Sequence, residues 1–167
     1  MLEPATPSQD LSAPTTDALA PAGSPHAPGI QPTDLSLPMM LLRARELVME
    51  HFRPFLLEND LTDAQWRVLR VLHEAGALEP TEISMRGQVL TPSLTRILKA
   101  LEARALIERE RHHHDGRRHL VRLTPAAVEL IDRLTPLSVA GYREIETRFG
   151  RDETKRLVAL LTAFCDR

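Results

Sequence analysis

The sequence has little cysteine and few aromatic residues: Cys165 is the single cysteine among 167 residues, beside four Phe, one Trp and one Tyr. One cysteine cannot form an intramolecular disulfide, which fits a reducing compartment, so we expect a cytoplasmic protein. No run of about 18 apolar residues occurs, and no segment is therefore expected to span a membrane. Because aromatic residues are scarce, the core must consist mainly of Leu, Val, Ile, Ala and Met, which favours a mainly helical domain.

The first 37 residues lack Lys and Arg, but they contain four acidic residues and seven of the 13 prolines. Such a composition buries too little apolar surface to offset the entropy of ordering, so residues 1–34 are predicted to form a disordered Pro/Ala-rich tail. Neither a secretory leader nor a transit peptide is expected, because the first needs a basic start with an apolar run and the second needs arginines. The other 130 residues carry 21 bases and 19 acids, and they should form one domain.

The spacing of the apolar residues predicts six helices. A first helix is expected over about 35–57, with Pro54 near its end and Asn59 in the left-handed position that follows. The other helices are expected from the Thr62–Gln65 capping box to Gly76, over 80–87, from a Thr91–Pro92 cap, from a Thr124–Pro125 cap through Phe149, and over 152–164. Pro136 lies inside the long helix and should kink or interrupt it.

From residue 106 the alternation changes to a period of two, which predicts strands over 106–111 and 119–123. The polar loop between them is expected to contain Asp115 and Gly116. Two helices joined by a short turn and followed by a β-hairpin form a winged helix-turn-helix, whose second helix places its N-terminal residues in the DNA major groove. The predicted fold class is therefore mainly α, a winged helix-turn-helix with flanking N- and C-terminal helices.

Polar residues at the start of the predicted recognition helix lie opposite or beside its apolar stripe of Leu94, Leu98 and Leu101. Hydroxyl groups can bind phosphates and base edges, and an arginine can bind guanine through two hydrogen bonds. Residues 81–122 contain nine bases against five acids, a local charge of +4. The alternative is an ordinary solvated helix with surface arginines. The candidate DNA contacts on this helix are Thr91, Ser93, Thr95, Arg96 and Lys99.

The segment Asp115-Gly116-Arg117, followed by Val121-Arg122-Leu123-Thr124, resembles the wing of the MarR family of winged-helix regulators. The resemblance extends over roughly 37–165. The sequence is similar to the subgroup that regulates homoprotocatechuate (hydroxyphenylacetate) degradation in Phe52-Arg53-Pro54, Leu61-Thr62, Gln65-Trp66-Arg67, Pro92-Ser93-Leu94-Thr95 and Arg143-Glu144-Ile145-Glu146. One departure is Ala105, which stands where the family usually has glycine after the recognition helix. If φ is positive there, alanine is strained by roughly 1 kcal/mol.

The resemblance implies a homodimer in which 35–60 and 125–167 form dimerisation helices and 61–124 form the DNA-binding lobe. The apolar face of the last helix, with Leu157, Val158, Leu161 and Phe164, is consistent with this, although it could instead pack within its own subunit. In this interpretation the chain is a repressor of an aromatic-compound catabolic operon that binds a pseudo-palindromic double-stranded DNA operator.

The wing tip is expected to enter the minor groove, whose negative potential attracts the guanidinium groups of Arg117 and Arg118. Asp115 is expected to position Arg117 rather than to contact DNA, because its carboxylate would repel phosphate. An ordinary Asp-Gly turn would explain Asp115 and Gly116 but not the match around Arg117.

The resemblance also implies an effector pocket between the dimerisation helices and the DNA-binding lobe, for a hydroxyphenylacetate-like or hydroxynicotinate-like aromatic carboxylate. Such a ligand needs an apolar slot, a cation and a polar group for its ring hydroxyl. His51 could instead be a core histidine, and Trp66 could serve packing alone. The candidate effector-binding residues are Arg43, Arg45, His51, Phe52, Trp66 and Arg67.

No cofactor, metal site or enzymatic activity is expected. His112 and His114 share a strand face, but metal sites need three or four ligands and His119 is the only other close donor. Cys165 lies near the C-terminus, whereas peroxide-sensing relatives carry their cysteine near the first helix. Two alternatives remain: the same DNA-binding dimer responding to metal or redox, and a helical protein–protein adaptor without DNA binding, which would show little salt dependence with DNA.

Overall fold

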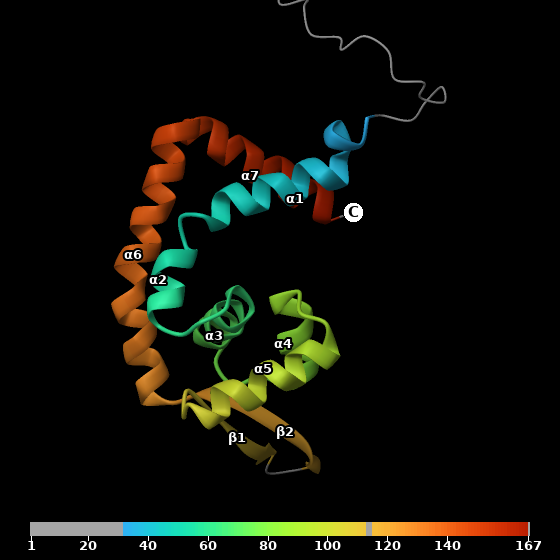
Figure 1. Cartoon of the computed structure of the whole chain (residues 1–167). Coiled ribbons are helices and arrows are strands. Elements are labelled where there is room, and N and C mark those ends of the chain that lie inside the picture. The colour runs from blue at the N-terminus through green and yellow to red at the C-terminus, as the bar shows by residue number, and fades with distance from the viewer. Residues whose placement is uncertain (1–31, 113–114, 167) are drawn as a thin grey trace, which may run out of the picture.

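The computed structural model describes residues 32–112 and 115–166, and side chains within these ranges except those of 111–118. The predicted tail lies outside the described residues as far as residue 31. The long helix α6 (Pro125–Phe149) forms a spine with the helix-turn-helix and wing at one end and two helical arms at the other (Figure 1). The arms are α1 (Leu37–Met49), which follows a short 3-10 helix over Thr33–Leu35, and α7 (Arg151–Cys165).

The prediction of one helix over 35–57 is wrong, because the chain breaks at residues 50–52 into α1 and a short α2 (Arg53–Glu58). Pro54 lacks an N–H, which would cost a hydrogen bond inside a helix but none in the first turn, so it stands in the first turn of a new helix rather than near the end of the old one. The left-handed residue after α2 is Asp60, with φ 53°, and not Asn59. The Asn59 side chain instead donates a hydrogen bond to the carbonyl oxygen of Phe55 at 2.8 Å.

The lobe consists of α3 (Asp63–Ala75), α4 (Pro80–Gly87) and α5 (Thr91–Ala103). The capping box of α3 is confirmed, because Thr62 Oγ1 accepts from the Gln65 backbone N–H and the Gln65 side chain accepts from that of Thr62. The expected cap of α5 is wrong by one residue. Leu90 is the N-cap, and Thr91 and Pro92 occupy the first two helical positions.

The wing is an antiparallel hairpin of β1 (Ile107–His112) and β2 (Asp115–Leu123). Asp115 and Gly116 therefore belong to a strand rather than to the predicted loop. Leu78 and Val121 exchange two backbone hydrogen bonds of 3.0 and 2.8 Å, which attaches the α3–α4 connection to the wing. The sequence analysis missed this pairing because a single bridge residue has no periodicity.

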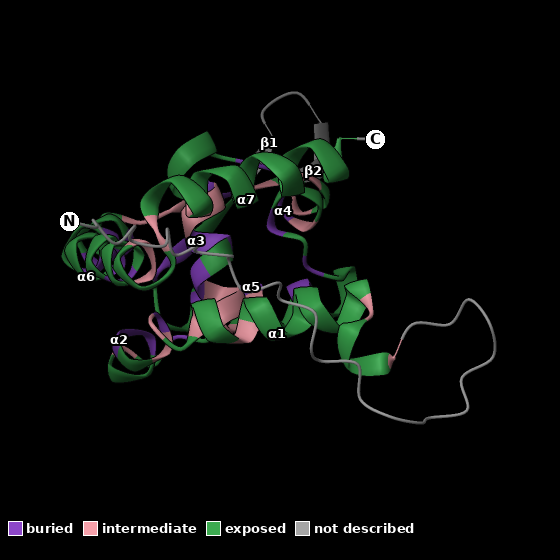
Figure 2. Ribbon diagram, turned by 90° about the horizontal axis from the view of Figure 1, so that it is seen from above, coloured by how far each residue is buried: buried purple, intermediate pink, exposed green. Residues whose placement is uncertain are grey.

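Helix α6 runs through Pro136 without interruption, and Thr124 caps it as predicted. The buried core lies among α2–α6 and the wing, with Val68, Leu69, Ile83, Leu101 and Val121 each at most 1% exposed. Helices α1 and α7 contain no buried residue, and Figure 2 shows them as two separate, exposed arms. None of the described helices combines the length and the apolar character needed to cross a membrane.

Candidate nucleic-acid interface and ligand pocket

Helix α5 buries one face and leaves the predicted contact residues free. Leu94, Leu98 and Leu101 anchor it to the core and are at most 2% exposed. The five predicted contact residues are all exposed: Thr91, Ser93, Thr95, Arg96 and Lys99. Among the described residues, neither Arg96 nor Lys99 has an ion-pair partner. Both side chains are therefore available to an anion such as a phosphate or a base edge.

Three other bases of the 81–122 segment are held within the protein. Arg104 donates two hydrogen bonds to the carbonyl oxygens of Asp60 and Asn59, at 2.6 and 2.9 Å. Arg109 pairs with Glu102 at 3.2 Å, and Arg122 pairs with Glu108 at 3.1 Å. The local charge counted from the sequence therefore overstates the charge that this surface offers to a partner. The side chains of Asp115, Arg117 and Arg118 lie outside the described residues.

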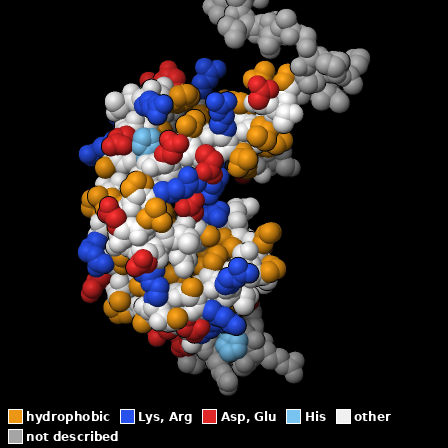
Figure 3. Space-filling view, viewed as in Figure 1, with side chains coloured by type: hydrophobic (Ala, Val, Ile, Leu, Met, Phe, Trp, Pro, Cys, Tyr) orange, Lys and Arg blue, Asp and Glu red, His pale blue; other side chains and the backbone are white. Residues whose placement is uncertain are grey.

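A half-open pocket of about 410 Å³ lies between the α1 arm and the lobe. Its wall includes the end of α1 with Phe52, one face of α3, the end of α4 with its C-cap, and two residues of α6. These residues are Val48, Met49, Phe52, Trp66, Arg67, Arg70, Val71, Glu74, Arg86, Gly87, Gln88, Ser138 and Tyr142. Figure 3 shows this face of the molecule hollowed between the arm and the α4 side of the lobe. The pocket thus borders directly on the turn that precedes α5.

Four of the six predicted effector residues line this pocket, namely Arg45, Phe52, Trp66 and Arg67. Arg43 and His51 are not among its lining residues. His51 lies between α1 and α2, where its Nδ1 meets the Glu144 carboxylate of α6 at 3.0 Å. This contact holds the arm to the spine, and it follows from the helix break that the sequence analysis did not predict.

Arg70 is a pocket residue that the sequence analysis did not select. Its Nη2 donates to Glu74 at 2.7 Å, and its guanidinium carbon lies 5.9 Å from the centre of the Trp66 ring. Its Nε is buried and has no hydrogen-bond partner. A buried, unpartnered donor is costly, so it marks a position where a ligand acceptor would be favourable. The sequence did contain a signal for Arg70: it follows Trp66 by one helical turn and therefore lies on the same face of α3.

Aromatic rings connect the α3 wall of the pocket to the α6 wall. The ring of Phe55 lies 6.2 Å from Trp66 and 6.0 Å from Phe52, and Phe52 lies 5.0 Å from Tyr142, all edge to face. Trp66 and Phe52 are 7% and 5% exposed, so both pack in the core as well as lining the pocket. The pocket therefore offers a planar ligand an apolar, aromatic wall.

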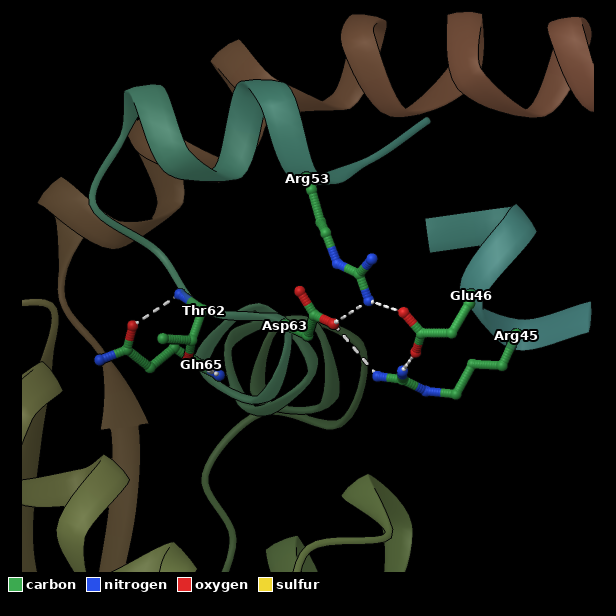
Figure 4. Close-up of polar contacts among 6 residues, drawn as sticks. All are labelled: Arg45, Glu46, Arg53, Thr62, Asp63 and Gln65. Carbon is green, nitrogen blue, oxygen red and sulfur yellow. Dashed lines mark hydrogen bonds and ion pairs between the residues drawn. The ribbon is translucent and has the colours of Figure 1, made fainter. Parts of the chain in front are cut away.

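An ion-pair network joins α1 and α2 to the start of α3 (Figure 4). Arg45 donates to Glu46 at 2.6 Å and to Asp63 at 3.1 Å, while Arg53 donates to the other oxygen of Glu46. Arg53 also lies 3.8 Å from Asp63. The hydrogen bond from Arg53, reinforced by the charges of both arginines, holds the pKa of Glu46 below its ordinary value. The network shares Arg45 and Asp63 with the pocket wall.

No group of three or more His, Cys, Asp or Glu side chains that could hold a metal ion occurs in the described part of the chain. The stretch His112–His114, which prompted the metal alternative, lies outside the side chains described.

Large apolar side chains cover the two arms. On α7 the exposed residues include the four predicted from the sequence, Leu157, Val158, Leu161 and Phe164. On α1 the exposed apolar residues include Leu37, Met40, Leu41 and Leu47. The alternative that the α7 face packs within its own subunit is wrong for these residues, since α7 buries none of its side chains.

The structure combines a helix-turn-helix whose second helix carries basic side chains on its outer face, a β-hairpin wing, and an aromatic pocket beside the turn. The first two features define the winged helix-turn-helix class of DNA-binding proteins. The chain belongs to the MarR family of transcriptional regulators. The family's profile matches residues 61–119. The Escherichia coli "homoprotocatechuate degradative operon repressor" is 35% identical over 129 residues, which cover 77% of this chain and 87% of that protein.

Two solved structures of similar fold contain a bound ligand or bound DNA. NadR in complex with 4-hydroxyphenylacetate is 34% identical, with a TM-score of 0.68 over 87% of this chain and 97% of that one. CouR bound to a 23-mer DNA duplex is 29% identical, with a TM-score of 0.73 over 81% and 98%. The Escherichia coli relative and CouR are both named repressors, which confirms the expectation of a transcriptional regulator rather than an enzyme.

Proposed function

We propose that the chain is a homodimeric repressor of an aromatic-compound catabolic operon, released from a pseudo-palindromic operator by a small aromatic carboxylate. The observation that carries this proposal is the composition of the pocket wall, which contains both Arg70, whose Nε is unpartnered, and the end of α4 at Gly87 and Gln88, in front of α5. A relative that represses homoprotocatechuate degradation and another that binds 4-hydroxyphenylacetate support the ligand class.

In this proposal Arg70 binds the effector carboxylate and the wall of Trp66 and Phe52 holds its ring. A carboxylate can accept hydrogen bonds from the Nε and an Nη of one guanidinium, which is a strong and directional arrangement. Arg45 is less suited to this role because it pairs with two carboxylates, those of Glu46 and Asp63, whereas Arg70 pairs with Glu74 alone. Arg67 also lines the pocket and contributes positive charge.

On the DNA side, α5 would enter the major groove through Arg96 and Lys99, and the wing would bring Arg117 and Arg118 to the minor groove, with Asp115 positioning Arg117. Two recognition helices related by a two-fold axis would read half-sites about one turn of DNA apart. The exposed apolar arms α1 and α7 would form the dimer interface. A ligand that binds one spacing of the helices more tightly than the other would then shift the dimer away from its DNA-binding geometry.

A binding selection from a random duplex pool, followed by competition with ligand, tests this function. We expect a selected duplex to bind in a strongly salt-dependent manner, and Arg96→Ala to weaken binding by about 1–3 kcal/mol. 4-Hydroxyphenylacetate should release the duplex, whereas 4-hydroxyphenylacetamide should not. Equal release by the acid and the amide, or no selected duplex at all, would refute the proposal.

A matched pair of variants tests the proposed contact between Arg70 and the effector carboxylate. Arg70→Gln should lower the affinity for the acid by at least about tenfold, since hydrogen bonds to charged groups are worth about 1.5–3 kcal/mol. Arg43→Gln removes an arginine of α1 that does not line the pocket, and it should leave the affinity unchanged. Fluorescence of Trp66, the single tryptophan, reports binding directly.

A further inference from the structure

Ser138 is a polar residue that lies in the core. It is 4% exposed and is the one polar side chain among the buried residues of the described chain. It lies on α6, two residues after Pro136, and forms part of the pocket wall together with Tyr142. A hydroxyl at this depth needs a hydrogen-bond partner, because burying an unpaired hydroxyl costs free energy.

The helical threonines show what a hydroxyl in this fold usually does. Thr135 on the same helix donates to the carbonyl oxygen of Ile131 at 2.8 Å, one turn earlier. Thr147, Thr154 and Thr162 do the same towards Arg143, Gly150 and Val158. The Ser138 hydroxyl makes no such bond and has no side-chain partner within the described residues. Ser138 is thus a buried residue whose hydroxyl bonds to no described side chain or helix carbonyl and which lines the pocket.

The same pocket is lined on α3 by Arg70, whose Nε is buried and unpartnered. The rings of Trp66, Phe52 and Tyr142 also line the pocket, from α3, the α1–α2 break and α6. A pocket with aromatic rings, an arginine of α3 and a neutral hydroxyl of α6 in its wall matches an aromatic acid with a polar ring substituent. It does not match an unsubstituted ring acid, which would leave the hydroxyl unpaired.

We propose that Ser138 determines the specificity of the pocket by forming a hydrogen bond with a ring hydroxyl, or an equivalent polar ring substituent, of the effector. This inference rests on the proposed function and assigns the hydroxyl contact to α6 rather than to His51, which faces Glu144. Because the serine hydroxyl both donates and accepts, it can pair with a phenol in either sense. A site that holds a polar partner for a ligand hydroxyl discriminates against the analogue that lacks it.

The test compares phenylacetate with 2-, 3- and 4-hydroxyphenylacetate on the full chain, with Trp66 fluorescence as the readout. The wild type should bind at least one hydroxylated isomer about three- to tenfold more tightly than phenylacetate, the range expected for a neutral hydrogen bond. Ser138→Ala, which keeps the size of the side chain, should reduce this ratio to about one. The affinity for phenylacetate should stay the same or rise slightly.

Thr135→Ala is the matched control, because it removes a hydroxyl from the same helix that already bonds to the backbone. It should leave the preference for the hydroxylated acid intact. A preference that survives in Ser138→Ala, with wild-type binding of both acids, would overturn the role of Ser138 and leave the proposed function standing. Failure of the wild type to bind any of the four acids would overturn both.

Discussion

Ala105 holds a left-handed backbone, with φ 51°, at the junction between α5 and β1. The positive φ meets the condition under which an alanine at this position, in place of the family's usual glycine, is expected to be strained. The turn is kept because its backbone is bonded on both sides. The Ala105 N–H donates to the Glu102 carbonyl oxygen at 2.9 Å, and its own carbonyl oxygen accepts from the Thr124 hydroxyl at 2.8 Å. These bonds also connect the recognition helix to the start of α6.

Ala105→Gly should therefore stabilise the protein. A Cβ in the left-handed region costs roughly 1–2 kcal/mol. That cost exceeds the roughly 0.5–1 kcal/mol of extra entropy that a glycine loses on folding. We expect the free energy of unfolding to rise by up to about 1 kcal/mol, measured as a higher urea midpoint at an unchanged m-value.

Ala103→Gly, in the last helical position of α5, is the control and should lower the midpoint. If both glycine variants destabilise the protein equally, Ala105 is not strained.

At the scale of elements, the contact between the α1 arm and the lobe depends on the network of Arg45, Glu46, Arg53 and Asp63. All four side chains are partly exposed, so solvent screens their attraction. The network nevertheless helps to fix the orientation of α1 relative to the lobe. The helix is interrupted at 50–52, so no continuous helix fixes that orientation. It also positions one side of the ligand pocket.

The network should make stability pH-dependent in a defined direction. The Arg53 hydrogen bond lowers the pKa of Glu46 in the folded state below its ordinary value of 4.5. A lowered pKa adds stability above the unfolded-state value, and this stability is lost as the pH falls through the folded-state value. The melting temperature of the wild type should therefore exceed that of Glu46→Gln near pH 7, and the difference should shrink below about pH 4.5.

Glu58→Gln is the comparison variant, because Glu58 is an exposed glutamate of α2 that forms no ion pair with the described residues. Its melting temperature should follow the wild type across the same pH range. A Glu46→Gln difference that is constant with pH would show that the network adds no pH-dependent stability.

At the scale of the whole molecule, the two arms expose many large apolar side chains. Leu157, Val158, Leu160 and Phe164 on α7 are 42–62% exposed. Large contiguous apolar surfaces of this kind mark interaction sites. In the proposed homodimer the partner's arms cover them, and the distance between the two recognition helices then depends on how the arms pack.

Leu161→Glu should shift the chain from dimer to monomer in sedimentation velocity, because it places a charge in the apolar face of α7. DNA affinity should fall with it. Ala163→Glu adds the same charge on the opposite face of the helix and should leave the dimer intact. A wild type that sediments as a monomer, or a Leu161→Glu variant that remains dimeric, would contradict this interface.

Much of the fold was predictable from the sequence because it depends on local physics. The α3 capping box, the Thr124 cap and the leucine stripe of α5 each involve residues within a few positions of one another, and all three are present. The family followed from the wing motif, and the comparisons confirm it. The errors lie where two local rules compete, as at Pro54, which can either end one helix or begin another.

The pocket was only partly predictable, because tertiary packing decides which side chains meet. Trp66 on α3 and Ser138 on α6 are 72 positions apart in the sequence, and no local pattern indicates that they share a wall. The break before Arg53 directs His51 towards Glu144 and leaves Arg43 outside the pocket. Sequence by itself determined most of the elements, the caps of α3 and α6, and the family. The tertiary structure decided which arginine Nε was left without a partner and which hydroxyl lines the pocket, because burial and partner choice arise only when distant helices pack together.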